Sequence, residues 1–248
     1  MTTFALPSPF KLNLRVLGAV ALLVAGTAQA ADLNSVGQIG QANFKALSQD
    51  LGAAVAYKGL VPAETLGLVG FDVGVGLTAT QVENSTALRA AAGGASVPAS
   101  LPLASVRAVK GLPFNIDVGV ALGKVPLSNV RTVGGEIRWA VIEGGIAMPA
   151  VAVRAAVNRL GGVDHLKVNT TTFDVSISKG FLMLTPYAGV GTVLVRSSAP
   201  GTSLASESFS KGKVFAGLNV NLGLVNLAAE TDKTGNNTSY GLKAGLRF

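Results

Sequence analysis

The residues that could do catalytic chemistry are few in this chain of 248 residues. The single histidine, His165, directly follows Asp164 in a stretch that we expect to be a loop. A histidine oriented by a carboxylate can act as a general base, but nothing in the spacing holds a serine nucleophile against it. One histidine without any cysteine also leaves a metal site short of ligands. We therefore expect neither an enzyme nor a protein with a bound metal or cofactor.

Two glycine pairs have the spacing with which nucleotide-binding loops begin. They are Gly74-x-Gly76 and Gly189-x-Gly191. Both lie inside segments that alternate between apolar and polar residues, which is typical of strands, and neither opens a helix. We therefore interpret these glycines as small residues that let neighbouring side chains pack, and not as a nucleotide site.

Charged residues that alternate with apolar ones are the more informative set. Because side chains alternate along a strand, these residues share the face opposite to the apolar face. Four are acidic and four are basic, so they could pair in a salt-bridge network that closes an interior. The alternative is a thin polar pore or a small-ligand pocket between opposed charges. The residues expected on this inner face are Asp72, Asp117, Glu136, Arg138, Arg154, Asp174, Lys243 and Arg247.

The last twelve residues show the strand pattern most clearly. One face of this segment carries Tyr240, Leu242, Ala244, Leu246 and Phe248. The other face carries glycine, serine, lysine and arginine. Similar segments recur from Leu66 onwards, separated by stretches rich in glycine, proline and polar residues. The pattern predicts an all-β fold with about ten strands, with eight and twelve as the alternative counts.

Composition indicates that these strands lie in a membrane. The chain is 49% hydrophobic and 13% charged, whereas a soluble domain has about 25% charged residues. After residue 30, no uninterrupted apolar run reaches the roughly 18 residues that a spanning helix needs. Each backbone polar group needs an internal partner in lipid, so a membrane protein without spanning helices is a closed β-barrel. We predict a transmembrane antiparallel up-and-down β-barrel, and a soluble β-sandwich is the alternative.

The end of the chain resembles the terminal strand of Gram-negative outer-membrane β-barrels, in which a C-terminal phenylalanine is typical. The resemblance implies a place in the outer membrane among its lipids. It also implies recognition by the barrel-assembly machinery through a signal that includes Tyr240, Leu246 and Phe248. Two further segments, LGLVGFDVG at 66–74 and SISKGF at 176–181, resemble an uncharacterised family of proteobacterial barrel proteins. That likeness implies no particular activity.

The N-terminus has the features of an export signal. Lys11 and Arg15 precede an apolar core, and Ala28-Gln29-Ala30 fits a cleavage site. We predict that residues 1–30 are a cleaved secretory signal peptide, and a transmembrane anchor is the alternative.

Residues 31–65 are predicted to be a separate N-terminal segment, and residues 66–248 the barrel. Apolar residues at helical spacing predict a short amphipathic helix over 33–51. This helix could plug the lumen or form a lid on the periplasmic mouth. The other interpretation is a periplasmic leader packed on the barrel rim.

Loop lengths predict the orientation of the barrel. Barrels of this type have short periplasmic turns and longer external loops. We expect periplasmic links near residues 111, 145, 181 and 223, with both chain ends in the periplasm. The expected external links are 81–102, 125–130, 160–165, 198–208 and 232–236.

Basic residues gather near the expected outer ends of the strands. We predict that they contact lipopolysaccharide phosphates, and the alternative is that they only keep the loops soluble. They are not clustered enough to indicate nucleic-acid binding. The predicted contacts are Lys124, Arg131, Arg159, Lys167, Arg196, Lys211, Lys213 and Lys233.

Two functions remain open from the sequence. The first hypothesis is passive passage of a small solute or ligand through the barrel. The second is a closed barrel with a structural or adhesive role that acts through its external loops, with 81–102 as the partner-binding segment.

Overall fold

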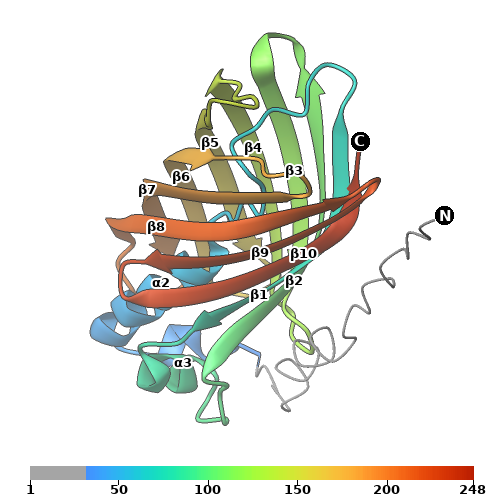
Figure 1. The fold of residues 1–248 in the computed structure, drawn as a ribbon. Helices are drawn as coiled ribbons and strands as arrows, with labels where there is room; N and C mark the ends of the chain where they lie inside the picture. The colour runs from blue at the N-terminus through green and yellow to red at the C-terminus, as the bar shows by residue number, and fades with distance from the viewer. Residues whose placement is uncertain (1–31) are drawn as a thin grey trace, which may run out of the picture.

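The computed structural model describes residues 32–248, so the predicted signal peptide over residues 1–30 lies outside the described residues. In this part of the chain, ten strands form a closed antiparallel barrel in which each strand pairs with its sequence neighbours and β10 closes on β1 (Figure 1). The predicted ten-strand up-and-down barrel is confirmed. The strands are β1 (Phe71–Gln81), β2 (Ser100–Leu112), β3 (Ile116–Lys124), β4 (Arg131–Ile142), β5 (Ala150–Gly161), β6 (Lys167–Ser178), β7 (Leu184–Ser198), β8 (Glu207–Leu222), β9 (Val225–Thr234) and β10 (Asn237–Arg247).

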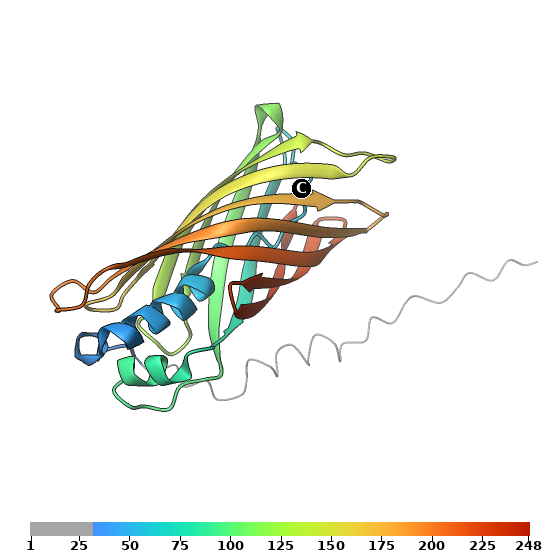
Figure 2. The same ribbon diagram turned by 90° about the vertical axis from the view of Figure 1, so that its left-hand side faces the viewer.

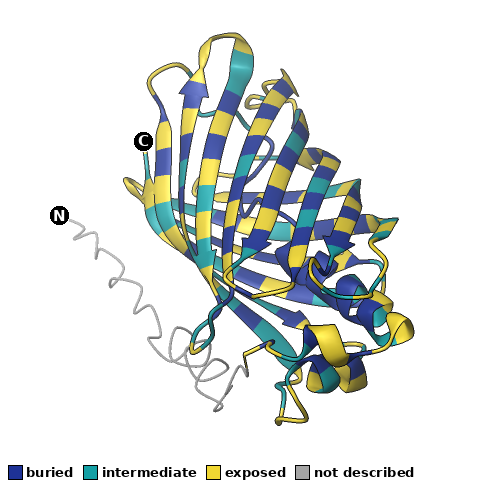
Figure 3. Ribbon diagram, turned by 180° about the vertical axis from the view of Figure 1, so that it is seen from behind, coloured by how far each residue is buried: buried dark blue, intermediate teal, exposed yellow. Residues whose placement is uncertain are grey.

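Buried and exposed residues alternate along the strands of the barrel wall (Figure 3). In β6, Asp174 and Ser176 are buried, whereas Phe173 and Val175 are 48% and 47% exposed. The outer surface is therefore the apolar one and the inner surface the polar one. A soluble protein has the opposite distribution, with apolar side chains inside and polar ones outside. The arrangement seen here fits a wall that separates lipid from a polar interior.

The C-terminal strand closes the wall against the first strand. Val73 lies opposite Leu246, and Ala79 lies opposite Tyr240. The backbone amides of Phe71 and Phe248 each donate to the other residue's carbonyl at 2.9 Å, and the two rings stack with centroids 5.7 Å apart. The closure leaves no unpaired edge in the wall.

The predicted N-terminal helix is present, with shifted bounds. α2 spans Gln41–Val55 and follows a short 3-10 turn, η1 (Val36–Gln38). It starts after Gly40, whose backbone is extended, and so begins later than the predicted 33. It continues past residue 51 because Ala53, Ala54 and Val55 are buried and are compatible with a helix.

A second helix lies where the sequence predicts only a loop. α3 (Ser85–Ala91) is part of the link between β1 and β2, and it packs against α2. Its buried residues are Ala87, Leu88 and Ala91. Small side chains at helical spacing in an alanine-rich stretch do not stand out from a loop. One more 3-10 turn, η2 (Pro113–Asn115), joins β2 to β3.

Both helices lie at one end of the barrel, away from the C-terminus (Figure 2). We call this end the helix mouth and the other end the C-terminal mouth. At the helix mouth, the Gln41 side chain donates to the Ala205 carbonyl at 3.1 Å, and the Asp32 carboxylate accepts from the Asn129 amide at 3.2 Å. These partners belong to links predicted to be external. α2 therefore lies at the same end as these links, so the predicted periplasmic position of the helix and the predicted external position of the links cannot both hold.

The apolar core lies inside the helix mouth. Phe44, Leu47 and Leu51 of α2 belong to one buried cluster with Val193 and Val195 of β7. In residues 32–248, no helix has the length and apolar character that crossing a membrane requires. Packing in the buried cluster fixes α2 at the helix mouth, and the chain that follows α2 enters the bore.

Candidate functional site

Residues 56–66, which we call the bore segment, run from the end of α2 through the interior of the barrel. Tyr57, Lys58, Leu60 and Ala63 are buried there. The segment has no regular secondary structure after Ala56. Its backbone N–H and C=O groups therefore need partners on the barrel wall, since a buried backbone group without one costs free energy.

Wall side chains supply these partners in the half of the bore nearer the helix mouth. The Asn158 amide donates to the Val55 carbonyl at 2.8 Å, and the Lys213 ammonium donates to the Tyr57 carbonyl at 2.8 Å. Arg107 donates to the Lys58 carbonyl at 2.9 Å. The wall thus presents cations to carbonyl oxygens, a strong kind of hydrogen bond.

Wall side chains also bond to the bore segment in the half of the bore nearer the C-terminal mouth. Arg138 donates to the Pro62 carbonyl at 2.7 Å, and the Ala63 amide donates to Ser178 Oγ at 3.1 Å. Asp117 accepts from the Thr65 hydroxyl at 3.2 Å and from the Leu66 amide at 3.1 Å. The bore segment is therefore anchored along its whole length.

The bore segment also carries a charge of its own. The Lys58 ammonium lies 2.9 Å from Asp232 Oδ1 and donates to the Ala53 carbonyl at 3.0 Å. Beside it, the Leu60 amide donates to Glu230 Oε2 at 3.1 Å. Removing the segment would leave Asp232 without its cation inside the barrel.

Tyr57 occupies the space between two guanidinium groups. The Arg107 and Arg154 guanidinium carbons lie 5.6 Å and 6.0 Å from the ring centroid, which is cation–π distance. Arg107 also donates to the phenol oxygen at 3.3 Å. A cavity of about 30 Å³ beside Tyr57 and Lys58 has room for only a few water molecules. The buried Tyr57 ring therefore fills the space between these two wall residues at this level of the bore.

The structure brings most of the predicted inner charges together. Arg154 pairs with Asp174 at 2.8 Å and lies 3.5 Å from Glu136. Lys243 pairs with Asp72 at 2.5 Å.

Arg138 pairs with Asp117, and this pair also holds the bore segment. Arg247, the eighth predicted residue, is half-buried and makes no ion pair with any residue of the described chain.

Sequence reasoning missed several inner charges. Arg107 and Glu230 lie at inward positions that the alternation of β2 and β9 would have given. Asp232 falls in a predicted link, because the apolar alternation of this segment ends before it, whereas β9 continues to Thr234. Lys58 lies outside any strand, so no periodicity could place it.

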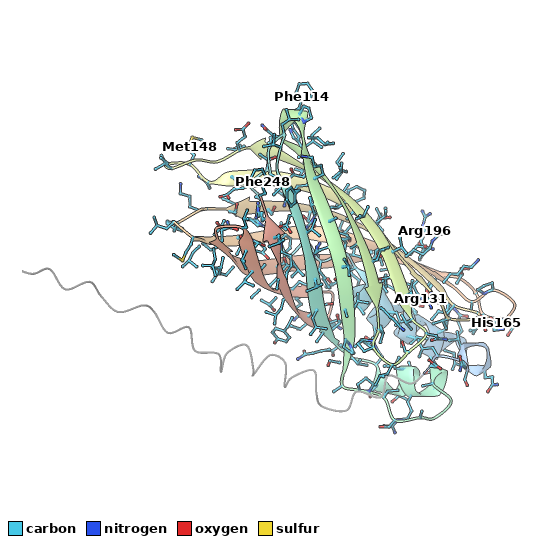
Figure 4. The ribbon with its side chains drawn as sticks, turned by 90° about the vertical axis from the view of Figure 1, so that its right-hand side faces the viewer. Phe114, Arg131, Met148, His165, Arg196 and Phe248 are labelled. Carbon is cyan, nitrogen blue, oxygen red and sulfur yellow. The ribbon has the colours of Figure 1, made fainter. Side chains whose placement is uncertain are left out.

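The predicted lipopolysaccharide contacts divide into two groups. Six are exposed on the outer wall at the helix mouth and form what we call the basic collar: Lys124, Arg131, Arg159, Lys167, Arg196 and Lys233. Figure 4 shows Arg131 and Arg196 near this end and Phe114, Met148 and Phe248 at the opposite one.

The other two predicted contacts face the interior. Lys213 is 1% exposed, and Lys211 lies with its ammonium 5.6 Å from the Phe209 ring centroid. The predicted lipid contact of Lys213 is wrong, because β8 begins at Glu207 and this residue falls on its inner face. Lys211 has the same parity and does not belong to the collar.

The residues of the predicted assembly signal lie on the outer face of β10 and directly after its end. Tyr240, Leu246 and Phe248 are 56%, 54% and 62% exposed. They lie on the strand that closes the barrel, with their side chains open to a partner. Recognition by the assembly machinery stays a prediction.

His165 is exposed in the link between β5 and β6. Its Nδ1 lies 2.8 Å from the Pro200 carbonyl, in the link between β7 and β8. This contact joins two neighbouring links at the helix mouth and gives the histidine a structural role.

The comparisons with known proteins concern the fold. No protein-family model and no curated protein matches the chain, so membership of the uncharacterised proteobacterial family stays a prediction. Among solved structures, the N-terminal β-barrel domain of Pseudomonas aeruginosa OprF is 12% identical, with a TM-score of 0.36, over 73% of this chain and 99% of that one. The outer membrane protein OprG of the same species is 10% identical, with a TM-score of 0.33, over 76% and 99%. The translocator domain of the autotransporter NalP from Neisseria meningitidis is 13% identical, with a TM-score of 0.33, over 84% and 96%. The chain is thus similar to outer-membrane β-barrel proteins, and the likeness extends to the fold alone.

Proposed function

We propose that this protein is an integral outer-membrane barrel that is closed at rest by the bore segment and passes small polar solutes when that segment moves aside. The observation that carries the proposal is a charged interior that, within residues 32–248 and beyond the apolar cluster of the helix mouth, is crossed by a stretch of coil held by wall side chains.

A membrane location is supported by the outer surface. A soluble monomer rarely exposes contiguous apolar patches larger than a few hundred Å². Here every strand presents apolar side chains outward, and a closed barrel with such a belt is stable in lipid because all its backbone groups are paired. The belt includes Val73, Val106, Val120, Ile137, Val153, Val175, Val190, Leu218, Val225 and Leu246.

Passage through the bore is supported by the kind of contact that holds the segment. Backbone groups of residues 57–66 bond to Arg107, Lys213, Glu230 and Arg138, and water can replace each of these partners. α2, in contrast, is held by a buried apolar cluster. The segment can therefore leave the axis when water enters to solvate its partners, including Lys58 and Asp232, while the apolar cluster holds α2 at the mouth and keeps the segment tethered.

A disulfide lock tests this proposal. The chain has no cysteine, and the Ala63 amide lies 3.1 Å from Ser178 Oγ, so these residues are neighbours. The variant carrying Ala63→Cys and Ser178→Cys should show no conductance steps in planar bilayers when oxidised, and steps should return on reduction. The single Ala63→Cys variant is the matched control and should be insensitive to the oxidant.

The closed structural or adhesive barrel is the second candidate. It is favoured by the dense set of buried ion pairs, which fixes the wall and the bore segment together. If the reduced lock variant and the wild type both lack conductance steps, the pore is wrong and this candidate stands. Deleting residues 85–95, around α3, should then abolish surface attachment without changing permeability.

A further inference from the structure

A hollow on the outer wall crosses β4 to β7 at the edge of the apolar belt. Its volume is about 540 Å³. Arg159 and Arg196 border it, Asn169 lies between them, and Val133, Val157 and Leu194 form its apolar part. We call it the collar hollow, because its two arginines belong to the basic collar.

Strand register arranges these residues by polarity. Val133, Arg159, Asn169 and Arg196 lie opposite one another in a single row across the four strands. The next outward row towards the C-terminal mouth holds Val157 and Leu194. The hollow is thus cationic on the side of the helix mouth and apolar on the side of the belt, which is the polarity of one leaflet of a membrane.

The cations of the hollow have no carboxylate to neutralise them. Among the described residues, neither Arg159 nor Arg196 makes an ion pair, and the acidic residues Glu136 and Asp174 of these strands face the bore. The Arg159 Nε donates to the Asn169 side chain at 2.9 Å, which orients its guanidinium. Two uncompensated guanidinium groups above an apolar floor fit an anionic group that is attached to hydrocarbon.

We propose that the collar hollow binds an outer-leaflet phosphoglycolipid of the lipid A class. A phosphate would lie between Arg159 and Arg196, and Asn169 would bond to a sugar hydroxyl or amide. An acyl chain would follow Val133, Val157 and Leu194 down the belt. This inference rests on the proposed outer-membrane location, and it narrows the predicted lipopolysaccharide contact from the whole collar to one site.

The test compares two charge-reversed variants of the whole mature protein. One carries Arg159→Glu and Arg196→Glu, and its matched control carries Lys124→Glu and Lys233→Glu, which are also exposed on the collar but lie outside the hollow. The protein is refolded without lipopolysaccharide in phosphatidylcholine vesicles, and binding of purified lipid A is then titrated. The hollow variant should bind about tenfold more weakly, since hydrogen bonds to a charged group are lost, and the control should bind like the wild type.

Three outcomes would overturn the site. They are equal weakening in both variants, unchanged binding in the hollow variant, and equal binding of phosphatidylglycerol and lipid A by the wild type. The variant carrying Arg159→Ala and Arg196→Ala guards against misfolding, and it should also lose binding. Heat-modifiable migration in the phosphatidylcholine vesicles reports insertion separately. A barrel that fails to insert there contradicts the membrane location, whereas one that inserts but does not bind lipid A contradicts only the hollow.

Discussion

The two mouths of the barrel are built in opposite ways. At the helix mouth the interior is apolar, filled by the cluster around α2, and the outer wall carries the basic collar. At the C-terminal mouth the interior holds ion pairs such as Lys243 with Asp72, and the outside carries exposed apolar side chains up to the tips of the turns. Figure 4 shows Arg196 and Phe248 towards these opposite ends.

The turns at the C-terminal mouth carry exposed apolar residues at their tips. Ile146 and Leu182 are fully exposed at 104% and 103%, and Phe114 is 86% exposed. Turns that face water carry polar residues, so apolar tips indicate that the belt continues to the end of the barrel. We infer that the C-terminal mouth lies in the lipid interface and that the helix mouth projects beyond the membrane.

The largest expected effect is the all-or-none labelling of single cysteines in the cysteine-free chain. Lys45→Cys on α2 and Ser96→Cys in the β1–β2 link should both react with an impermeant maleimide on intact cells, because both lie at the helix mouth. Ile146→Cys should react only after the outer membrane is opened. Labelling of Ile146→Cys but not of Lys45→Cys on intact cells would mean that the barrel has the inverse orientation.

The bore offers the largest effect on stability. Asp117→Ala removes the partner of Arg138 and the acceptor of two bonds from the bore segment. Breaking a buried pair by removing one partner costs about 3–5 kcal/mol, so the free energy of unfolding in urea should fall by about that amount. Asp164→Ala, in an exposed loop, is the control and should change little. A fall of less than about 1 kcal/mol for Asp117→Ala would mean that water already solvates the bore, as for an exposed pair.

The sequence predicts the wall of this protein better than its filling. Period-two alternation fixes which side chains of a strand face inward, so Arg154 and Asp174 are placed without knowledge of the fold. The bore segment has no such period, and its contacts join residues far apart in the chain, such as Lys58 and Asp232. Strand ends are equally hard to read, since the residues that extend β9 to Thr234 are all polar. A place near a strand end also does not fix the side of the wall, and the parity that Lys213 shares with Asn219 puts it inside.

A smaller loss of stability is expected from changing the hydrogen bonds that link α2 to the helix mouth. Asp50 is fully buried and accepts from the Asn84 amide at 2.8 Å and the Asn237 side chain at 2.7 Å. Asp50→Asn turns one acceptor oxygen into a donor that faces other donors, so we expect a loss of about 2 kcal/mol. The measurements are thermal unfolding and limited proteolysis of residues 33–55.

The control for this change is Asp32→Asn at an exposed carboxylate with a single acceptor bond. Proteolysis that is equally slow in Asp50→Asn and the wild type would show that the apolar cluster alone holds α2. The polar link between α2 and the strands would then be dispensable.

The smallest change in stability is expected for a charge placed at an apolar turn tip. A basic residue on the lipid face costs about 2–4 kcal/mol at the bilayer midplane and about 0–1 kcal/mol near the interface. Leu182→Arg in the β6–β7 turn should therefore cost about 1 kcal/mol or less, and Val175→Arg, in the belt of the same hairpin, should cost several times more. Unfolding in phosphatidylcholine vesicles measures both. Equal costs would place the tip as deep as the belt, and no cost at either position would mean that lipid does not surround this wall. A small cost at Leu182 and a larger cost at Val175 is the result that the two mouths require. A barrel with a charged collar at one end can extend its apolar belt only towards the other end.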